Sequence, residues 1–509
     1  MASRDTHVVC LGAGPAGLTA GYLLAKKAVP VTVVEKDPVY VGGIARTATH
    51  KGFRFDIGGH RFFSKSKEVE DLWTEILGDD LLTRARKSRI YYNNQLFDYP
   101  LRAGDALIKL GPLEAVACVA SYLKASCFPV RAPKNFEEWV SNQFGRRLFD
   151  IFFRTYTEKV WGVKCAEISA DWAAQRVKGL SLGSAIWHSV FPQRVRDGER
   201  GEIVKTLIDR FRYPRKGPGM MWEVAAEKMR AMGGVLSMDA AVTGLRFDRT
   251  RNAWSVTTRN SAGAERTIAA NDVISSIPMR ELVGALEPRP SARTRQAAQL
   301  LKYRDFLIVA LIIKDRQQFD DNWIYVHDPK VKVGRIQNFK AWSPDLVPDE
   351  DRNCLGMEYF CFEGDGLWNA PDDALRAMAA DELVMLGLAE RADILDGCVI
   401  RQPKAYPVYD ANYQKHVDTI RDEIERDYPN LYLVGRNGMH KYNNQDHAMM
   451  TAMLSVENIV AGRKLYDPWR VNQDALYHES GEAGAETSLA RRGWGVAERA
   501  VPEISRSGP

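Results

Sequence analysis

Residues 7–36 read HVVCLGAGPAGLTAGYLLAKKAVPVTVVEK, the pattern of a strand, a tight turn, a helix and a second strand. Two short apolar runs, Val8–Leu11 and Val31–Val34, are rich in β-branched residues and are typical of buried strands. The segment between them carries apolar residues at helical spacing. These features predict a βαβ unit, and therefore an α/β domain with a parallel sheet.

The turn of this unit has the motif G-x-G-x-x-G. The first glycine permits a tight turn, the second lets a pyrophosphate approach the backbone, and the third lets helix and strand pack closely. The helix N-terminus then offers free N–H groups to phosphate. A glutamate ends the second strand, where a carboxylate accepts hydrogen bonds from ribose hydroxyls and repels a 2′-phosphate. We therefore expect a dinucleotide other than NADP, bound by Gly12, Gly14, Pro15, Ala16, Gly17, Glu35 and Lys36.

The composition narrows the class of protein. A chain of 509 residues is too long for one compact core, so we expect two or three domains. The net charge of +5 comes from 70 basic and 65 acidic residues, which gives no case for nucleic-acid binding. Seven scattered cysteines without C-x-x-C spacing favour reduced thiols in a cytoplasmic protein over disulfides or a metal site. We see no secretory signal before the first strand.

Three further segments extend the dinucleotide site. Residues 41–46 read VGGIAR, residues 272–278 read DVISSIP, and residues 431–436 read LYLVGR before a helical segment at 448–459. In this order they resemble the motifs of the flavoprotein superfamily that contains amine oxidases, protoporphyrinogen oxidases and UDP-galactopyranose mutases. The resemblance implies FAD as the cofactor. It also implies further cofactor-binding residues, which are Gly42, Gly43, Ile44, Arg46, Gly58, Gly59, His60, Val242, Gly435, Arg436, Asn444 and Gln445.

The same resemblance implies the fold. We expect an α/β protein in which a Rossmann-like FAD-binding domain, of the GR2 or amine oxidase type, is interrupted by helical and mixed-sheet substrate domains. The expected parts are 1–65, 206–290 and 401–465 for FAD binding, 66–205 for a helix-rich insertion, 291–400 for a substrate-domain sheet and 466–509 for a flexible C-terminal tail.

Several stretches resemble UDP-galactopyranose mutase more narrowly. They are FDIGGHRFF (55–63), SRIYYNNQLFDYPL (88–101), DWAAQRV (171–177), the run from Gly334 to Pro344, AYP (405–407) and HKYNNQDH (440–447). In that family they carry a histidine near the isoalloxazine, and the arginines and tyrosines that contact the substrate diphosphate. Two guanidiniums can hold a diphosphate bidentately, and phenols add neutral donors. The catalytic residues implied are His60, Arg176, Arg335, Tyr406, Tyr442 and Asn444.

Other roles stay open for these residues. The arginines could form surface ion pairs, and His60 and Tyr406 could be packed in a core. Asn444 stands where bacterial mutases have a carboxylate, so the sugar donor can differ from UDP-galactose.

The resemblance implies a pyranose–furanose mutase that acts on a sugar linked to a nucleotide or lipid diphosphate, through a reduced-flavin N5 adduct and without net oxidation. The alternative is an FAD-dependent oxidoreductase of the amine oxidase, protoporphyrinogen oxidase or desaturase type. The segment YPRKGPGM at 213–220 resembles those relatives equally well. A flavin-binding protein without catalysis is the third hypothesis.

The most apolar helical window is the segment 106–130. Lys109, Glu114 and Lys124 interrupt it, and its uncharged core of nine residues (115–123) is far shorter than the about 20 residues that span a bilayer. We interpret it as a buried or partly exposed helix, or alternatively as a surface that docks reversibly on a membrane. The expected location is therefore cytoplasmic, with membrane association in the second case. The sequence does not indicate the oligomeric state.

Overall fold

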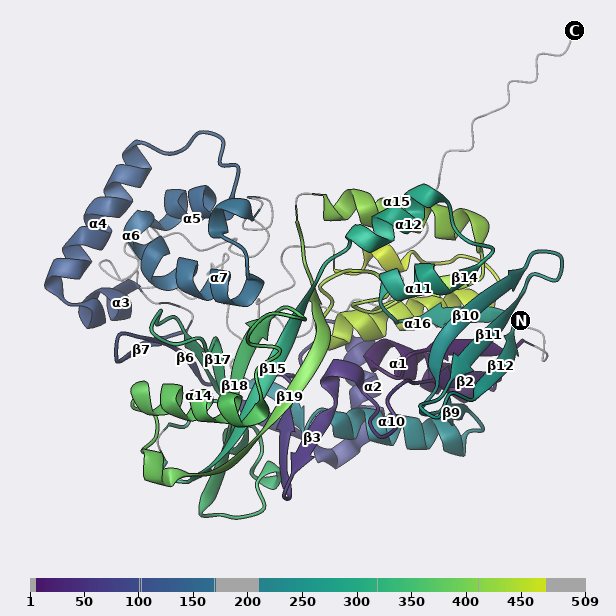
Figure 1. Ribbon diagram of the computed structural model, residues 1–509, viewed down its shortest axis with the longest axis horizontal. Coiled ribbons are helices and arrows are strands. Elements are labelled where there is room, and N and C mark those ends of the chain that lie inside the picture. The colour runs from purple at the N-terminus through teal and green to yellow at the C-terminus, as the bar shows by residue number, and fades with distance from the viewer. Residues whose placement is uncertain are drawn as a thin grey trace, which may run out of the picture.

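A computed structural model describes residues 6–472, except 100, 102, 169, 171–209, 318 and 411. Its strands form a five-stranded sheet, a four-stranded sheet, a seven-stranded sheet and two isolated strand pairs (Figure 1). The strand pairs are β3 (Thr47–His50) with β4 (Phe53–Asp56), and β5 (Leu81–Ala85) with β8 (Arg210–Pro214).

The five-stranded sheet is entirely parallel, in the order β20-β13-β1-β2-β9. Its strands are β1 (Val8–Leu11), β2 (Val31–Val34), β9 (Val235–Ser237), β13 (Asp272–Ser275) and β20 (Leu431–Leu433). They come from distant parts of the chain, so insertions separate them. The βαβ unit predicted for residues 7–36 and the Rossmann-like α/β fold are both confirmed.

Both faces of this sheet are buried, which explains why its strands are continuous apolar runs. In β1, Val8 and Cys10 belong to one core and Val9 and Leu11 to the other. The first core includes side chains of α1 (Pro15–Lys26), α2 (Lys67–Leu77), α10 (Gly219–Ala231) and α16 (Gln445–Ala461). The second includes side chains of α11 (Met279–Ala285), α12 (Ala292–Leu300), α15 (Tyr413–Asp427) and the four-stranded sheet.

The four-stranded sheet has the order β12-β11-β10-β14. Its strands are β10 (Ala241–Asp248), β11 (Ala253–Arg259), β12 (Glu265–Ala270) and β14 (Leu286–Glu287).

The seven-stranded sheet is mixed, in the order β19-β15-β18-β17-β16-β6-β7. Its strands are β6 (Ser88–Tyr92), β7 (Gln95–Asp98), β15 (Tyr303–Lys314), β16 (Trp323–Val326), β17 (Arg335–Asn338), β18 (Arg352–Cys361) and β19 (Ile394–Pro407). Alternate residues of β15 enter two cores, one with α14 (Asp372–Met385) and one with α13 (Phe339–Trp342) and β4. Strands β6 and β7 lie within residues 66–205, the insertion that we expected to be helix-rich, and they extend this sheet.

A group of short helices packs beside β6 and β7, at the upper left of Figure 1. The helices are α3 (Ala103–Leu110), α4 (Pro112–Cys127), α5 (Phe136–Phe144), α6 (Arg146–Phe149) and α7 (Thr155–Trp161). The window 106–130, which we treated as one helix, is two helices. The break is at Gly111, whose φ of +86° does not fit a right-handed helix.

The C-terminal boundary also needs a correction. Residues 466–472, which we assigned to the tail, are packed against the domain. Val471 is buried, and its carbonyl and that of Trp469 accept hydrogen bonds from the ammonium of Lys441. The remainder of the predicted tail, 473–509, lies outside the described residues.

Candidate functional site

A cavity of about 450 Å³ is lined by both major sheets. From the parallel sheet come the turn between β1 and α1, the end of β2 and the segment after β20. From the seven-stranded sheet come side chains of β16, β17 and the end of β19. The predicted dinucleotide motif and the predicted substrate residues therefore share one cavity.

The glycine turn has the geometry that a bound diphosphate needs. Gly12 has φ of +91°, and a Cβ on Gly17 would lie 1.8 Å from the Gly12 carbonyl oxygen, so neither position tolerates a side chain. A Cβ on Gly14 would meet nothing within 4 Å, which leaves the backbone open on the cavity side. Gly14 is also the N-cap of α1. Because no side chain caps this end of the helix, its backbone N–H groups are available to phosphate.

Glu35 lies at the end of β2 and lines the cavity. Its carboxylate accepts backbone hydrogen bonds from Ala13, at 2.7 Å, and from Asp37, at 3.0 Å. These bonds fix the carboxylate beside the glycine turn. A carboxylate has about four acceptor sites, so it can still accept ribose hydroxyls.

The second glycine pair supports the first turn. The Gly42 N–H donates to the Ala13 carbonyl at 2.8 Å, and a Cβ on Gly43 would lie 3.4 Å from Gly14. Arg46 donates to the Gly43 carbonyl and to Gln402, and it does not line the cavity. Its guanidinium therefore ties the turn to β19 in this structure.

His60 is a strongly perturbed titratable group of the predicted set. Burial, together with the charges of Arg436 and Arg335, lowers its pKa to about 3, so the ring is neutral. Its Nδ1 is buried and, within the described part of the chain, has no hydrogen-bond partner. Two other atoms of cavity-lining residues, Asn437 Oδ1 and Gln445 Nε2, are also buried without a hydrogen-bond partner in the described part of the chain. Such atoms suit a polar ring system with carbonyl and N–H edges, so the residues present fit a flavin.

Arg335 is held by a partner that the sequence did not predict. Its Nε lies 2.5 Å from Oε2 of Glu358, which is fully buried, and Glu358 also accepts from Gln337 at 2.8 Å. Burial by itself would lower the pKa of Arg335, but the adjacent carboxylate outweighs it and raises the pKa well above its usual value. Arg335 therefore stays charged.

Two tyrosines and a second arginine stand beside this pair. The rings of Tyr406 and Tyr442 stack with centroids 5.6 Å apart and an interplanar angle of 12°. The Arg436 guanidinium lies 5.2 Å from the Tyr406 ring and 5.1 Å from the Tyr442 ring. Arg335 Nη2 is 3.5 Å from the Tyr406 hydroxyl. The group combines two fixed cations with two phenols.

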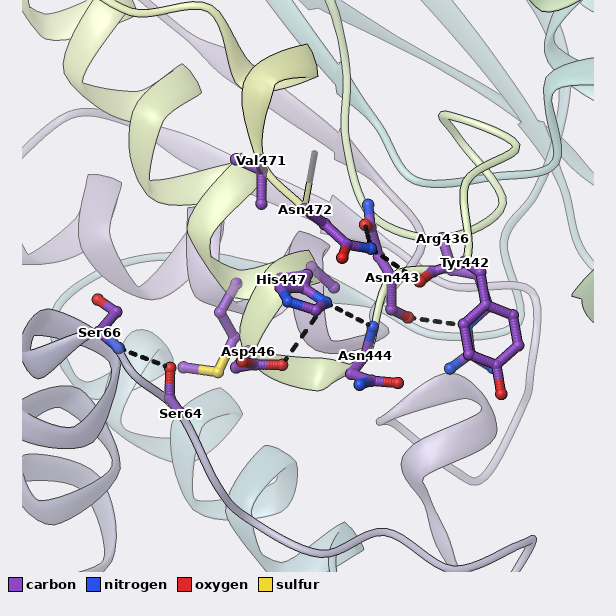
Figure 2. Close-up of polar contacts among 12 residues, drawn as sticks. Ser64, Ser66, Arg436, Tyr442, Asn443, Asn444, Asp446, His447, Val471 and Asn472 are labelled. Atoms are coloured by element: carbon purple, nitrogen blue, oxygen red, sulfur yellow. Dashed lines mark hydrogen bonds and ion pairs between the residues drawn. The ribbon is translucent and has the colours of Figure 1, made fainter. Parts of the chain in front are cut away.

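The segment between β20 and α16 is fixed by its own hydrogen bonds (Figure 2). Arg436 Nε donates to the Asn443 carbonyl, and the Asn472 side chain donates to the Tyr442 carbonyl. Asn444 is the N-cap of α16, where its side chain and that of His447 form a reciprocal capping box. These contacts pre-organise the tyrosine and the helix N-terminus toward the cavity.

Most of the predicted residues that the structure describes line this one cavity. The exceptions are Gly17, Gly42 and Arg46, which support the turns, while Arg176 lies outside the described residues. The predicted residues that do line it are Gly12, Gly14, Pro15, Ala16, Glu35, Lys36, Gly43, Ile44, Gly58, Gly59, His60, Val242, Arg335, Tyr406, Gly435, Arg436, Tyr442, Asn444 and Gln445.

The sequence analysis missed several lining residues. Arg61 was quoted within FDIGGHRFF but given no role, and no role was predicted for Trp323 and Tyr325, which lie on β16. An arginine directly after the predicted flavin-contacting histidine was a signal that could have identified Arg61.

Comparisons with known proteins agree with this architecture. The domain family described as NAD(P)-binding Rossmann-like domain matches residues 10–76. A crystal structure of reduced UDP-galactopyranose mutase matches with a TM-score of 0.77 at 20% identity, over 92% of this chain and 99% of that chain. A putative protoporphyrinogen oxidase from Exiguobacterium sp. 255-15 matches with a TM-score of 0.67 at 17% identity, over 90% of this chain and 99% of that chain.

A third match is putrescine oxidase bound to putrescine, with a TM-score of 0.57 at 16% identity, over 90% of this chain and 99% of that chain. At these identities the likeness concerns the fold. The chain therefore has the fold shared by UDP-galactopyranose mutase and amine oxidase-type proteins, as the sequence resemblance implied.

Proposed function

We propose that this protein is an FAD-dependent mutase that interconverts the pyranose and furanose forms of a sugar linked to a diphosphate. The observation that carries the proposal is the group of Arg335, Arg436, Tyr406 and Tyr442 in the same cavity as the dinucleotide turn. Fixed guanidiniums and phenols are the donors that a diphosphate requires. A cationic amine substrate would be repelled by these guanidiniums.

FAD would be held by the glycine turn at its diphosphate, by Glu35 at its ribose, and by the segment around His60 and the α16 N-terminus at its ring. When bound and reduced, it would supply a nucleophilic nitrogen for the anomeric carbon, without net oxidation of the sugar.

The residues of the chain hold and stabilise the leaving group. As the bond from the anomeric carbon to oxygen breaks, negative charge grows on the diphosphate, and Arg335 and Arg436 stabilise it electrostatically. The hydroxyls of Tyr406 and Tyr442 donate hydrogen bonds to the same oxygens. Because the diphosphate stays bound, it can return to the anomeric carbon after the ring has changed size. His60 is neutral and adds no charge near the flavin ring.

The second candidate is an FAD-dependent oxidoreductase. The observation in its favour is the aromatic part of the cavity wall, where Trp323, Tyr325 and Trp342 lie together. Such rings can surround an apolar or amine substrate and position it for hydride transfer.

The two candidates differ in what the reduced protein does. We expect dithionite-reduced protein, incubated with UDP-galactose and related sugar nucleotides, to form a ring isomer that chromatography separates from the substrate. The oxidised protein should form none. Arg335→Lys should lower conversion by about tenfold or more, because a lysine cannot replace a bidentate guanidinium. The matched control is Arg316→Lys, which alters an exposed arginine that pairs with Asp393 far from the predicted site residues. If no sugar diphosphate is isomerised and an amine or porphyrinogen instead reduces the flavin, the oxidoreductase is correct.

A further inference from the structure

Helix α4 presents an apolar side to solvent. Leu113, Val116 and Leu123 are 89%, 69% and 56% exposed. Together with the alanines at 117 and 120 they recur at spacings of three and four, so they share one side of the helix. The opposite side carries Cys118 and Tyr122, which pack into the core of the helical group.

The exposed apolar surface continues beyond both ends of α4. Ile108 on α3 is 82% exposed, and Phe128 and Val130 after α4 are 81% and 46% exposed. These six residues are half of the twelve large hydrophobic side chains that are exposed in the described part of the chain. Single exposed hydrophobic residues are common, but six within 23 residues form a patch that indicates an interaction surface.

The charges around this patch are unbalanced. Three of its carboxylates form ion pairs, Asp105 with Lys109, Glu114 with Arg147 and Glu137 with Arg146, while Glu138 accepts a hydrogen bond from the Lys134 N–H. By contrast, Lys124, Arg131 and Lys134 are exposed and have no ion pair among the described residues. The patch is therefore an apolar stripe with free positive charge at its edge.

We propose that this patch, the α4 surface (Ile108, Leu113, Val116, Leu123, Lys124, Phe128, Val130 and Arg131), docks on an anionic lipid bilayer. Among the described helices none is long and apolar enough to cross a membrane. A helix of 16 residues is about 24 Å long and can lie in the plane of the interface, with its apolar side among the acyl chains. The free cations then contact anionic headgroups.

The charges favour lipid over a second copy of this chain. A two-fold symmetric dimer through the same patch would bring Lys124 and Arg131 of both copies into one interface, where Glu138 is the one carboxylate named above that has no ion pair with a described residue. An anionic bilayer supplies the missing negative charge. The inference does not depend on the proposed reaction, because it uses none of the cavity residues.

The helical group that carries α4 reaches the cavity at the end of α7. In Figure 1, α4 lies at the outer edge of that group, with α7 between it and the rest of the protein. At the end of α7, the Trp161 ring lies 6.1 Å from the ring of Tyr442.

The test is flotation of the purified flavin-loaded protein with vesicles of phosphatidylcholine alone or mixed with phosphatidylglycerol. We expect flotation with the anionic vesicles, little with the neutral ones, and a decrease as salt is raised. The double variant Leu113→Glu with Leu123→Glu should lower the floating fraction by about tenfold. The matched control is Met385→Glu, which alters a 58% exposed residue of α14 and should float like the wild type.

Flavin absorbance and thermal melting establish that each variant is folded. Equal flotation of the wild type and the double variant would overturn the proposal, as would no flotation at low salt. A wild-type dimer in solution that the double variant splits would assign the α4 surface to a second copy instead. A fall in flotation with melting temperature and flavin content unchanged would support the lipid surface.

Discussion

Replacing Glu358 by glutamine tests whether Arg335 faces a diphosphate. Glu358 is fully buried, and Arg335 and Gln337 donate to its two oxygens at 2.5 Å and 2.8 Å. The amide keeps the shape but leaves the Arg335 charge without a counter-charge. Removing one partner of a buried ion pair costs about 3–5 kcal/mol, a large part of the about 5–15 kcal/mol that stabilises a typical protein.

A bound diphosphate would restore the lost charge balance. We therefore expect UDP to raise the melting temperature of Glu358→Gln by more than that of the wild type. At a UDP concentration about one hundred times the Kd, binding adds about 2.7 kcal/mol of stability. The measurement is thermal unfolding with saturating FAD, with and without UDP.

The matched control for this experiment is Glu382→Gln. Glu382 is also buried and accepts hydrogen bonds from the backbone of Lys332 and Val333 and from Tyr359, but it does not line the cavity. The variant should lose stability that UDP does not restore. If UDP shifts the wild type and Glu358→Gln equally, Arg335 does not contact the diphosphate and the reasoning fails.

Four further predictions concern the cofactor end of the cavity and two buried titratable side chains. Gly14→Ala should fold normally, since its Cβ meets nothing within 4 Å, but should release FAD on gel filtration, because the methyl group blocks the phosphate. Gly17→Ala should not fold stably, because its Cβ would overlap the Gly12 carbonyl at 1.8 Å, and melting or expression yield will reveal this. Burial raises the pKa of Asp56 well above its usual value, so the folded state favours the neutral acid and loses stability as pH rises above about 4. Asp56→Asn should therefore melt at a higher temperature than the wild type at neutral pH, with a gain that shrinks toward pH 4. The pKa of His60 is lowered to about 3, so the stability that its neutral ring contributes is lost only as pH falls below about 6.5. Because the ring does not change charge between about pH 7 and 8, FAD binding should be independent of pH in that range in the wild type and in His60→Gln.

The first βαβ unit was predictable because it is local. β1, α1 and β2 lie within 27 residues, and each is specified by its own periodicity and by the glycines between them. The order of β9, β13 and β20 across the sheet is set by contacts hundreds of residues apart, and periodicity does not encode these. The family resemblance supplied the expectation that separated segments complete the FAD-binding domain, but it gave no strand order.

The pairing of Arg335 with Glu358 shows why the site could be predicted only in part. The two residues are 23 positions apart and face each other because β17 and β18 pair with Arg335 opposite Glu358. A shift of one residue in this register would turn Glu358 to the other face of the sheet. The sequence did contain a signal, since Glu358 is a single carboxylate within the apolar run GMEYFCF at 356–362.

This pair also constrains how a diphosphate can bind. Arg335 and Arg436 contribute two positive charges, and Glu358 removes one, so these residues give a net charge of about +1. A sugar diphosphate carries about two negative charges, and burying it against one positive charge would leave the site unbalanced. A third cation is therefore required. Arg61 lines the cavity and has no ion pair among the described residues, so it can supply that charge, as can Arg176, the predicted residue outside them. On the proposed function, the carboxylate that fixes Arg335 in place thus makes a further cation necessary for substrate binding.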